Sequence, residues 1–176
     1  MIYNKIISVV ETRKNKMVDE WVAEVRNSER MKIYNSLPDY ELKNMISKFI
    51  GYLIKFLKSE VSDRELGKYF VEVGKRRNEA RFPLCEIHHA VYITKKILWT
   101  NILSSSIIDN TLAVYLAMDI ITTIHDYFDR GIFYIIRGYV EQQVFTIEEK
   151  RILNKEQIKD YFFPGSSFKL DSNIFD

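Results

Sequence analysis

The apolar residues of this chain recur at helical spacing, and this feature constrains the fold most. Between residues 39 and 59, eight apolar side chains fall on one wide helical face, the pattern of a helix that faces the centre of a bundle. These residues are Leu42, Met45, Ile46, Phe49, Ile50, Leu53, Ile54 and Leu57. Glycine and proline number only six and three among 176 residues. Because both residues interrupt helices and build turns, their scarcity favours long helices over a turn-rich β-fold.

Similar patterns predict four further helices, over residues 3–34, 63–79, 83–104 and 109–144. The first of them is expected to break near residues 26–28. Capping residues mark the starts of the others: Ser36 or Asp39 for the helix over 39–59, Ser62 with Glu65 for the next, and Asp109 for the last. Pro83 suits a first helical turn, where its missing N–H costs nothing. The sequence therefore predicts an all-α fold, a single helical-bundle domain of about five helices.

The end of the chain differs from the rest. We expect residues 1–145 to form the helical domain and residues 146–176 to form a short helix followed by an irregular tail. Four aromatic residues lie between residues 161 and 168, around a Pro-Gly turn. Because this segment is too apolar for a solvated tail, we expect it to pack on the domain or on a partner. The eleven tyrosines and eleven phenylalanines of the chain also predict a homodimer.

Composition excludes several classes of protein. A net charge of +2 is too small to indicate nucleic-acid binding. The single cysteine cannot form an internal disulfide, and charged residues interrupt every candidate signal peptide or membrane span, so we expect a cytoplasmic protein without membrane insertion. The sequence contains no phosphate-binding loop, zinc motif or ordered catalytic triad. We therefore expect a protein that is not an enzyme.

The densest positive charge lies between residues 73 and 99. Four cations, Lys75, Arg76, Arg77 and Arg81, crowd around the predicted end of the helix over 63–79. They could bind an anion or the acidic surface of a partner. For Arg77 a structural ion pair with Asp129 or Glu86 is the favoured alternative. In the same region Gly74 would let another backbone come close.

Histidines provide a second set of candidates. His88 and His89 are adjacent, so their side chains point about 100° apart and cannot readily bind one metal together. His88 could instead act with a residue of another helix, and His125, near Asp129, is the natural second candidate. The favoured alternative is a hydrogen-bonded histidine in the core, with no cofactor. Cys85 could serve as a redox sensor, although a small buried residue is the simpler interpretation.

Several short elements, taken in order, resemble a known family. They are Gly74-x-x-Arg77, Pro83-Leu84, Ala90, Leu98-Trp99, Phe128-Asp129-Arg130 and Tyr139. Over roughly residues 15–142 the chain resembles the N-terminal domain of RsbT co-antagonist proteins, the sensory halves of bacterial stress-signalling scaffolds. The resemblance implies an all-helical, globin-like or bundle-like domain that is often dimeric, receives signals without chemistry and is commonly fused to an output domain. Because the related fold is globin-like, a haem held by one histidine in a helical pocket is a specific hypothesis. The residues after 142 are expected to be too few for such an output domain.

Together these observations predict a non-enzymatic bacterial signalling domain. It would bind a small ligand or a protein partner of a signalling pathway and change its interaction surface. The alternative is a globin-like protein that binds haem or another small molecule. The candidate ligand-binding residues are Arg77, Arg81, His88, His125 and Asp129.

Overall fold

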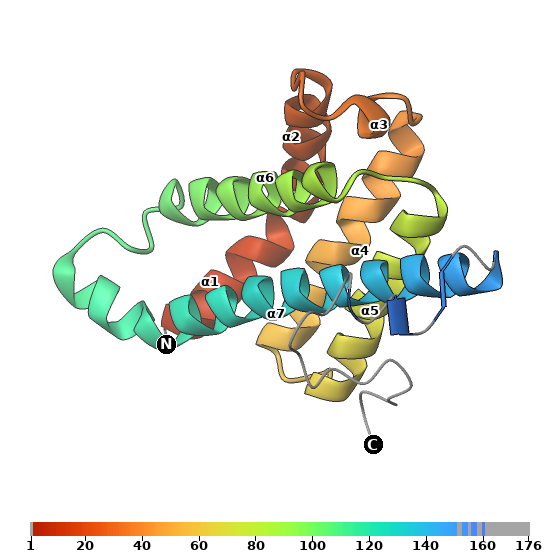
Figure 1. Cartoon of the computed structure of the whole chain (residues 1–176). Helices are drawn as coiled ribbons and strands as arrows, with labels where there is room; N and C mark the ends of the chain where they lie inside the picture. Colours follow the sequence, from red (N-terminus) through yellow and green to blue (C-terminus); the bar gives the residue numbers. More distant parts are fainter. Residues whose placement is uncertain (1, 151–152, 155, 158–159, 161–176) are drawn as a thin grey trace.

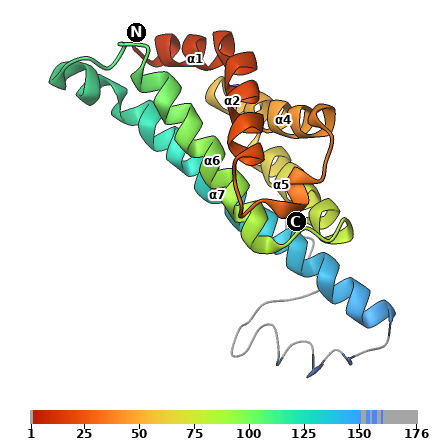
Figure 2. The ribbon, with the colours of Figure 1, turned by 90° about the horizontal axis from the view of Figure 1, so that it is seen from above.

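The fold is all-α. The computed structural model describes residues 2–150, 153–154, 156–157 and 160, and between residues 2 and 150 the chain forms seven helices. These are α1 (Ile2–Thr12), α2 (Lys14–Arg26), α3 (Lys32–Asn35), α4 (Asp39–Leu57), α5 (Asp63–Glu79), α6 (Leu84–Leu103) and α7 (Thr111–Glu149). Figure 2 shows α6 and α7 running alongside each other as a long pair, with α1, α2, α4 and α5 on one side of it. Within the described residues, no helix combines the length and apolar character needed to cross a bilayer.

The prediction of about five helices was too low, because the segment over 3–34 is not one helix. The expected break after Arg26 is present, and it separates α2 from the short helix α3. A second break, at Arg13, was missed. There the backbone turns (φ −94°, ψ 4°), and α2 leaves at an angle to α1 (Figure 1). Nothing in the local sequence requires this turn, since Arg13 is held by contacts with the distant end of α6 that are described below.

The other helices lie close to their predicted bounds. Ser62 and Glu65 form the predicted capping box at the start of α5. Two other predicted caps were wrong: Pro38 precedes α4 and makes no side-chain cap, and Asn110 instead of Asp109 caps α7. Helix α7 continues past residue 145 to Glu149. The predicted aromatic tail, residues 161–168, lies outside the described residues.

An aromatic cluster fills the space between α4, α5 and α7. Phe49, Phe70 and Tyr127 meet with ring centroids 5.3–5.7 Å apart. Tyr127 is fully buried, and its hydroxyl donates a hydrogen bond of 2.7 Å to the Phe49 carbonyl. Burial raises the pKa of Tyr127 well above its usual value of 10. Each such side chain contributes about 2–3 kcal/mol by leaving water, and the cluster therefore anchors α4 to the α5–α7 pair.

Helices α5 and α7 run in the same direction and touch backbone to backbone. Asp63 at the start of α5 pairs with Arg130 at 2.7 Å, and Lys75 near its end pairs with Glu141 at 3.6 Å. A Cβ atom added to Gly74 would lie 2.0 Å from the Ile135 carbonyl oxygen. This contact confirms the prediction that Gly74 lets another backbone come close, and it fixes α5 against α7.

Candidate functional site

A half-open cavity of about 240 Å³ lies between the helices of the domain. Its walls come from α2, α3, α4, α5, α6 and α7, and it falls within the range in which small molecules bind, slightly below the usual 300 Å³. The inner wall is mostly apolar and buried, with Trp21, Phe49, Ile87 and Ile135 among its residues. The lining also includes the exposed residues Asn44, Lys48 and Arg76 and the half-buried Arg77.

Arg77 is the predicted site residue that lines this cavity. Its guanidinium lies 5.0 Å from the ring centroid of Phe82 and 5.9 Å from that of Tyr34, so it packs on both aromatic faces. The Arg77 guanidinium also lies close enough to the Tyr34 hydroxyl to act on its pKa. Burial raises the pKa of the Tyr34 hydroxyl, and the charge of Arg77 offsets part of that rise. The predicted ion pair of Arg77 with Asp129 or Glu86 is not formed among the described residues.

Glu86 holds the α3 wall of the cavity, and the sequence prediction missed this role. The side chain belongs to the first turn of α6 and is only 6% exposed. Its Oε2 atom accepts a hydrogen bond of 3.0 Å from the Ile33 amide and one of 3.3 Å from the Tyr34 amide. Glu86 thus satisfies the free N–H groups at the start of α3 in place of a local capping residue. Because Tyr34 belongs to α3, Glu86 also positions the tyrosine that contacts Arg77.

The other predicted site residues do not line the cavity. His88 is exposed, so the interpretation of this residue as a core histidine was wrong. His125 is exposed and lies against Trp99, with ring centroids 5.5 Å apart. The carboxylate of Asp129 is 75% exposed and lies 3.9 Å from the Lys95 ammonium. The structure therefore does not bring His88, His125 and Asp129 together with Arg77.

Arg81 has a conformational role. It is exposed and adopts a positive φ of 58°, the left-handed backbone that ends many helices. The next amide, that of Phe82, donates a hydrogen bond of 2.9 Å to the Arg77 carbonyl across this turn. Arg81 therefore belongs to the turn between α5 and α6. The predicted small buried cysteine was also wrong, because Cys85 is exposed.

No metal site is apparent in the part of the chain that the structure describes. There, no three histidine, cysteine, aspartate or glutamate side chains gather closely enough to hold a metal ion.

A second hollow, an open groove of about 780 Å³, lies along α4 and α5. Side chains of both signs line it, including Lys55, Lys68, Glu65 and Glu72. Because these charges balance and the groove has no comparable apolar wall, it offers less selectivity for a small molecule than the cavity beside Arg77.

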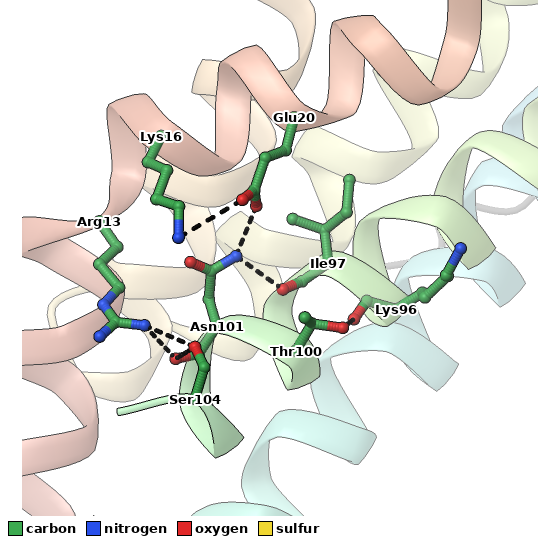
Figure 3. A network of polar contacts seen from close by, with 8 residues as sticks. All are labelled: Arg13, Lys16, Glu20, Lys96, Ile97, Thr100, Asn101 and Ser104. Atoms are coloured by element: carbon green, nitrogen blue, oxygen red, sulfur yellow. Dashed lines mark hydrogen bonds and ion pairs between the residues drawn. The ribbon is translucent and has the colours of Figure 1, made fainter. Parts of the chain in front are cut away.

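A polar network joins the α1–α2 turn to the last turns of α6 (Figure 3). The Arg13 guanidinium donates hydrogen bonds of 2.8 Å to the Asn101 carbonyl and to the Ser104 hydroxyl. The buried Asn101 amide nitrogen donates to Glu20 at 2.6 Å and to the Ile97 carbonyl at 3.1 Å. Since a carboxylate only accepts, the Glu20 contact fixes the orientation of this amide. The network holds α2 against α6 and does not line the cavity.

Comparison with known proteins identifies one family. A family model described as the RsbT co-antagonist protein rsbRD N-terminal domain matches residues 15–151. This range includes every described residue that lines the cavity. No curated protein and no solved structure matches the chain significantly.

Proposed function

The chain belongs to the family of RsbT co-antagonist protein rsbRD N-terminal domains, which are regulatory domains of stress signalling, and we propose that it senses a small molecule. The molecule occupies the half-open cavity. Its binding changes the packing of the surrounding helices and thereby a surface that another signalling protein reads. The chain acts in this way without catalysis.

The cavity itself is the observation that supports this proposal most. Small molecules usually bind in mostly apolar hollows that carry a few polar groups, and this half-open cavity of about 240 Å³ between six helices has that character. An apolar cavity of about 150 Å³ is already large enough to take benzene. Because residues from α2 to α7 form the walls, a molecule bound there contacts most of the domain at once. A bound molecule shifts the balance between two conformations only if its contacts differ between them, and contacts with six helices allow such a difference.

The sensing proposal can be tested with Trp21 as a reporter. The chain has two tryptophans, and Trp21 lines the cavity whereas Trp99 does not. In a Trp99→Phe background, neutral, cationic and anionic compounds of up to about ten non-hydrogen atoms are added one at a time. We expect a subset to change Trp21 emission and to slow amide hydrogen exchange in α4 and α5.

Val91→Phe provides the blocked variant, because Val91 lines the cavity and a larger side chain would occupy it. Val114→Phe, at a position of α7 that is 44% exposed, is the matched control. The emission changes should disappear in the first variant and persist in the second. If no compound changes Trp21 emission, or if Val91→Phe responds as the control does, the sensing proposal fails.

We further propose that the chain forms a homodimer through α7. Two pairs of exposed apolar side chains lie on α7. The first pair is Leu112 and Tyr115, and the second pair, Phe133 and Ile136, follows it 21 residues later. That separation is three heptads, which keeps both groups near one face of the helix. A second copy related by a two-fold axis would place one group against the other, an arrangement that pairs the same surface on both chains.

Replacing Tyr115 tests the dimer, because this side chain is 76% exposed and belongs to the proposed face. At about 10 µM, the expected mass of the wild-type protein in solution is twice the chain mass of 21.0 kDa. Tyr115→Lys should shift the protein to the chain mass, since a lysine in an apolar interface leaves a charge without a partner. Tyr40→Lys, at a 72% exposed position on α4, should stay dimeric. A wild-type protein of single-chain mass would contradict the proposal.

A further inference from the structure

The charges around the half-open cavity have one sign. Three cationic side chains, Lys48, Arg76 and Arg77, are among the described residues that line it, and none of those residues is acidic. The remaining lining is apolar, aromatic or uncharged. A cavity with a cationic side and an apolar inner wall matches a molecule that carries a negative group on an apolar body.

Among these cations, Arg77 is the one best placed to receive an anion. Arg76 is already paired with Glu72, at 3.0 Å. Within the described chain, Arg77 contacts aromatic rings and the Tyr34 side chain and has no carboxylate partner. An arginine has five N–H donors in a planar fork that matches a carboxylate, so most of this capacity is still available for a bound molecule.

Glu86 is an acidic group that must be weighed against this interpretation, because its charge acts on Tyr34. Its oxygens, however, accept the Ile33 and Tyr34 amides at the start of α3. The carboxylate is thus engaged with α3 and does not line the cavity. It leaves the Arg77 guanidinium without a direct ion pair.

We propose that the cavity binds a small organic monocarboxylate, whose carboxylate is held by the Arg77 guanidinium and the Tyr34 hydroxyl and whose apolar body lies against Trp21 and Ile87. This inference rests on the proposed sensing function and names the class of molecule that is sensed. Scaling from the cavity of about 150 Å³ that takes the six carbons of benzene gives a capacity of about ten non-hydrogen atoms. Octanoate and phenylacetate have about this size, and they differ in whether the apolar body is a flexible chain or a ring.

The test compares carboxylates with matched uncharged and cationic probes. Octanoate and phenylacetate are titrated into the Trp99→Phe protein, and Trp21 emission is followed. Octanamide, phenylacetamide and octylammonium are titrated in the same way. Since the amides match the carboxylates in shape, the difference in affinity isolates the charge. We expect at least one carboxylate to bind roughly 10- to 100-fold more tightly than its amide.

Arg77→Gln should remove that difference, because a neutral side chain gives up the charge-assisted hydrogen bonds. The amide should still bind to this variant as it binds to the unchanged protein, which shows that the cavity remains folded. Lys5→Gln, at an exposed position of α1, a helix that contributes no described residue to the cavity lining, should leave both affinities unchanged. Tyr34→Phe should weaken the carboxylate by a smaller factor than Arg77→Gln.

The proposal is overturned if the amides or octylammonium bind as tightly as the carboxylates, or if Arg77→Gln weakens carboxylate and amide equally. In both cases the cavity would still bind small molecules, and the sensing function would stand. If none of the five probes changes Trp21 emission at concentrations up to about 10 mM, the carboxylate proposal is also overturned. The sensing function is then tested separately, by the response of Trp21 emission to the broader set of compounds and by the loss of that response in Val91→Phe.

Discussion

Replacing Gly138 with alanine is expected to destabilise the protein by about 3 kcal/mol or more, although it adds a single methyl group. The new Cβ would lie 2.1 Å from the Val71 carbonyl oxygen and 2.8 Å from its carbonyl carbon. These atoms belong to the α5 backbone and cannot rotate away as a side chain can, so α5 and α7 must separate. Alanine is favoured over glycine in a helix by about 1 kcal/mol, and that gain is too small to offset the separation.

Urea unfolding followed by circular dichroism measures this effect, and Gly74→Ala should behave in the same way because it meets the Ile135 carbonyl. At about 2–4 °C per kcal/mol for a chain of this size, the melting temperature should fall by roughly 6–12 °C. Gly51→Ala is the matched control. Its Cβ would meet the Lys14 ammonium at 3.5 Å, an ordinary contact with a flexible side chain. We expect Gly51→Ala to leave the stability unchanged or to raise it by up to about 1 kcal/mol. If all three variants had similar stability, the close backbone contact between α5 and α7 would be refuted.

The second large effect is expected at Glu86. Glu86→Ala removes the carboxylate that accepts hydrogen bonds from the Ile33 and Tyr34 amides, and it leaves both N–H groups without an acceptor. An unsatisfied buried donor costs about 1–3 kcal/mol, so the expected loss of stability is about 3 kcal/mol. Because Tyr34 contacts Arg77, the same change should weaken any binding in the cavity that depends on this pair.

Glu86→Gln should retain part of the stability, since an amide oxygen can still accept hydrogen bonds from these amides but carries no charge. Glu29→Ala, which removes an exposed carboxylate, is expected to change stability by less than about 0.5 kcal/mol. Thermal and urea unfolding of the three variants give the comparison. Equal stabilities of Glu86→Ala and Glu29→Ala would show that Glu86 does not hold α3.

Local rules in the sequence explain much of the helical architecture. The apolar stripe over 39–59 became the buried face of α4, and the Ser62–Glu65 signal became a capping box. Gly74 was correctly interpreted as a point of close backbone approach. Each of these predictions depends on residues within a few turns of one another, where side-chain type and spacing determine the backbone. The resemblance to the RsbT co-antagonist family was confirmed by the family match over residues 15–151.

The misses share a different physical origin. The turn at Arg13 depends on Asn101 and Ser104, which follow it by 88 and 91 residues. The start of α3 depends on Glu86, which is more than 50 residues away in the chain. His88 was placed on an inner face because apolar residues flank it, but α6 turns that position outward. In each case the outcome depended on packing against a distant part of the chain, which the local sequence of the helix does not specify.

The sequence by itself therefore determined the helices, their principal buried faces and the family, because short-range spacing carries that information. Only the tertiary structure decided which of the candidate residues line a common cavity. It placed Arg77 against Tyr34 and Phe82, left His88, His125 and Asp129 on the surface, and closed α5 against α7 at two glycines. The physical reason is that a cavity is the space left over when helices have packed, and that packing depends on contacts between residues far apart in the chain.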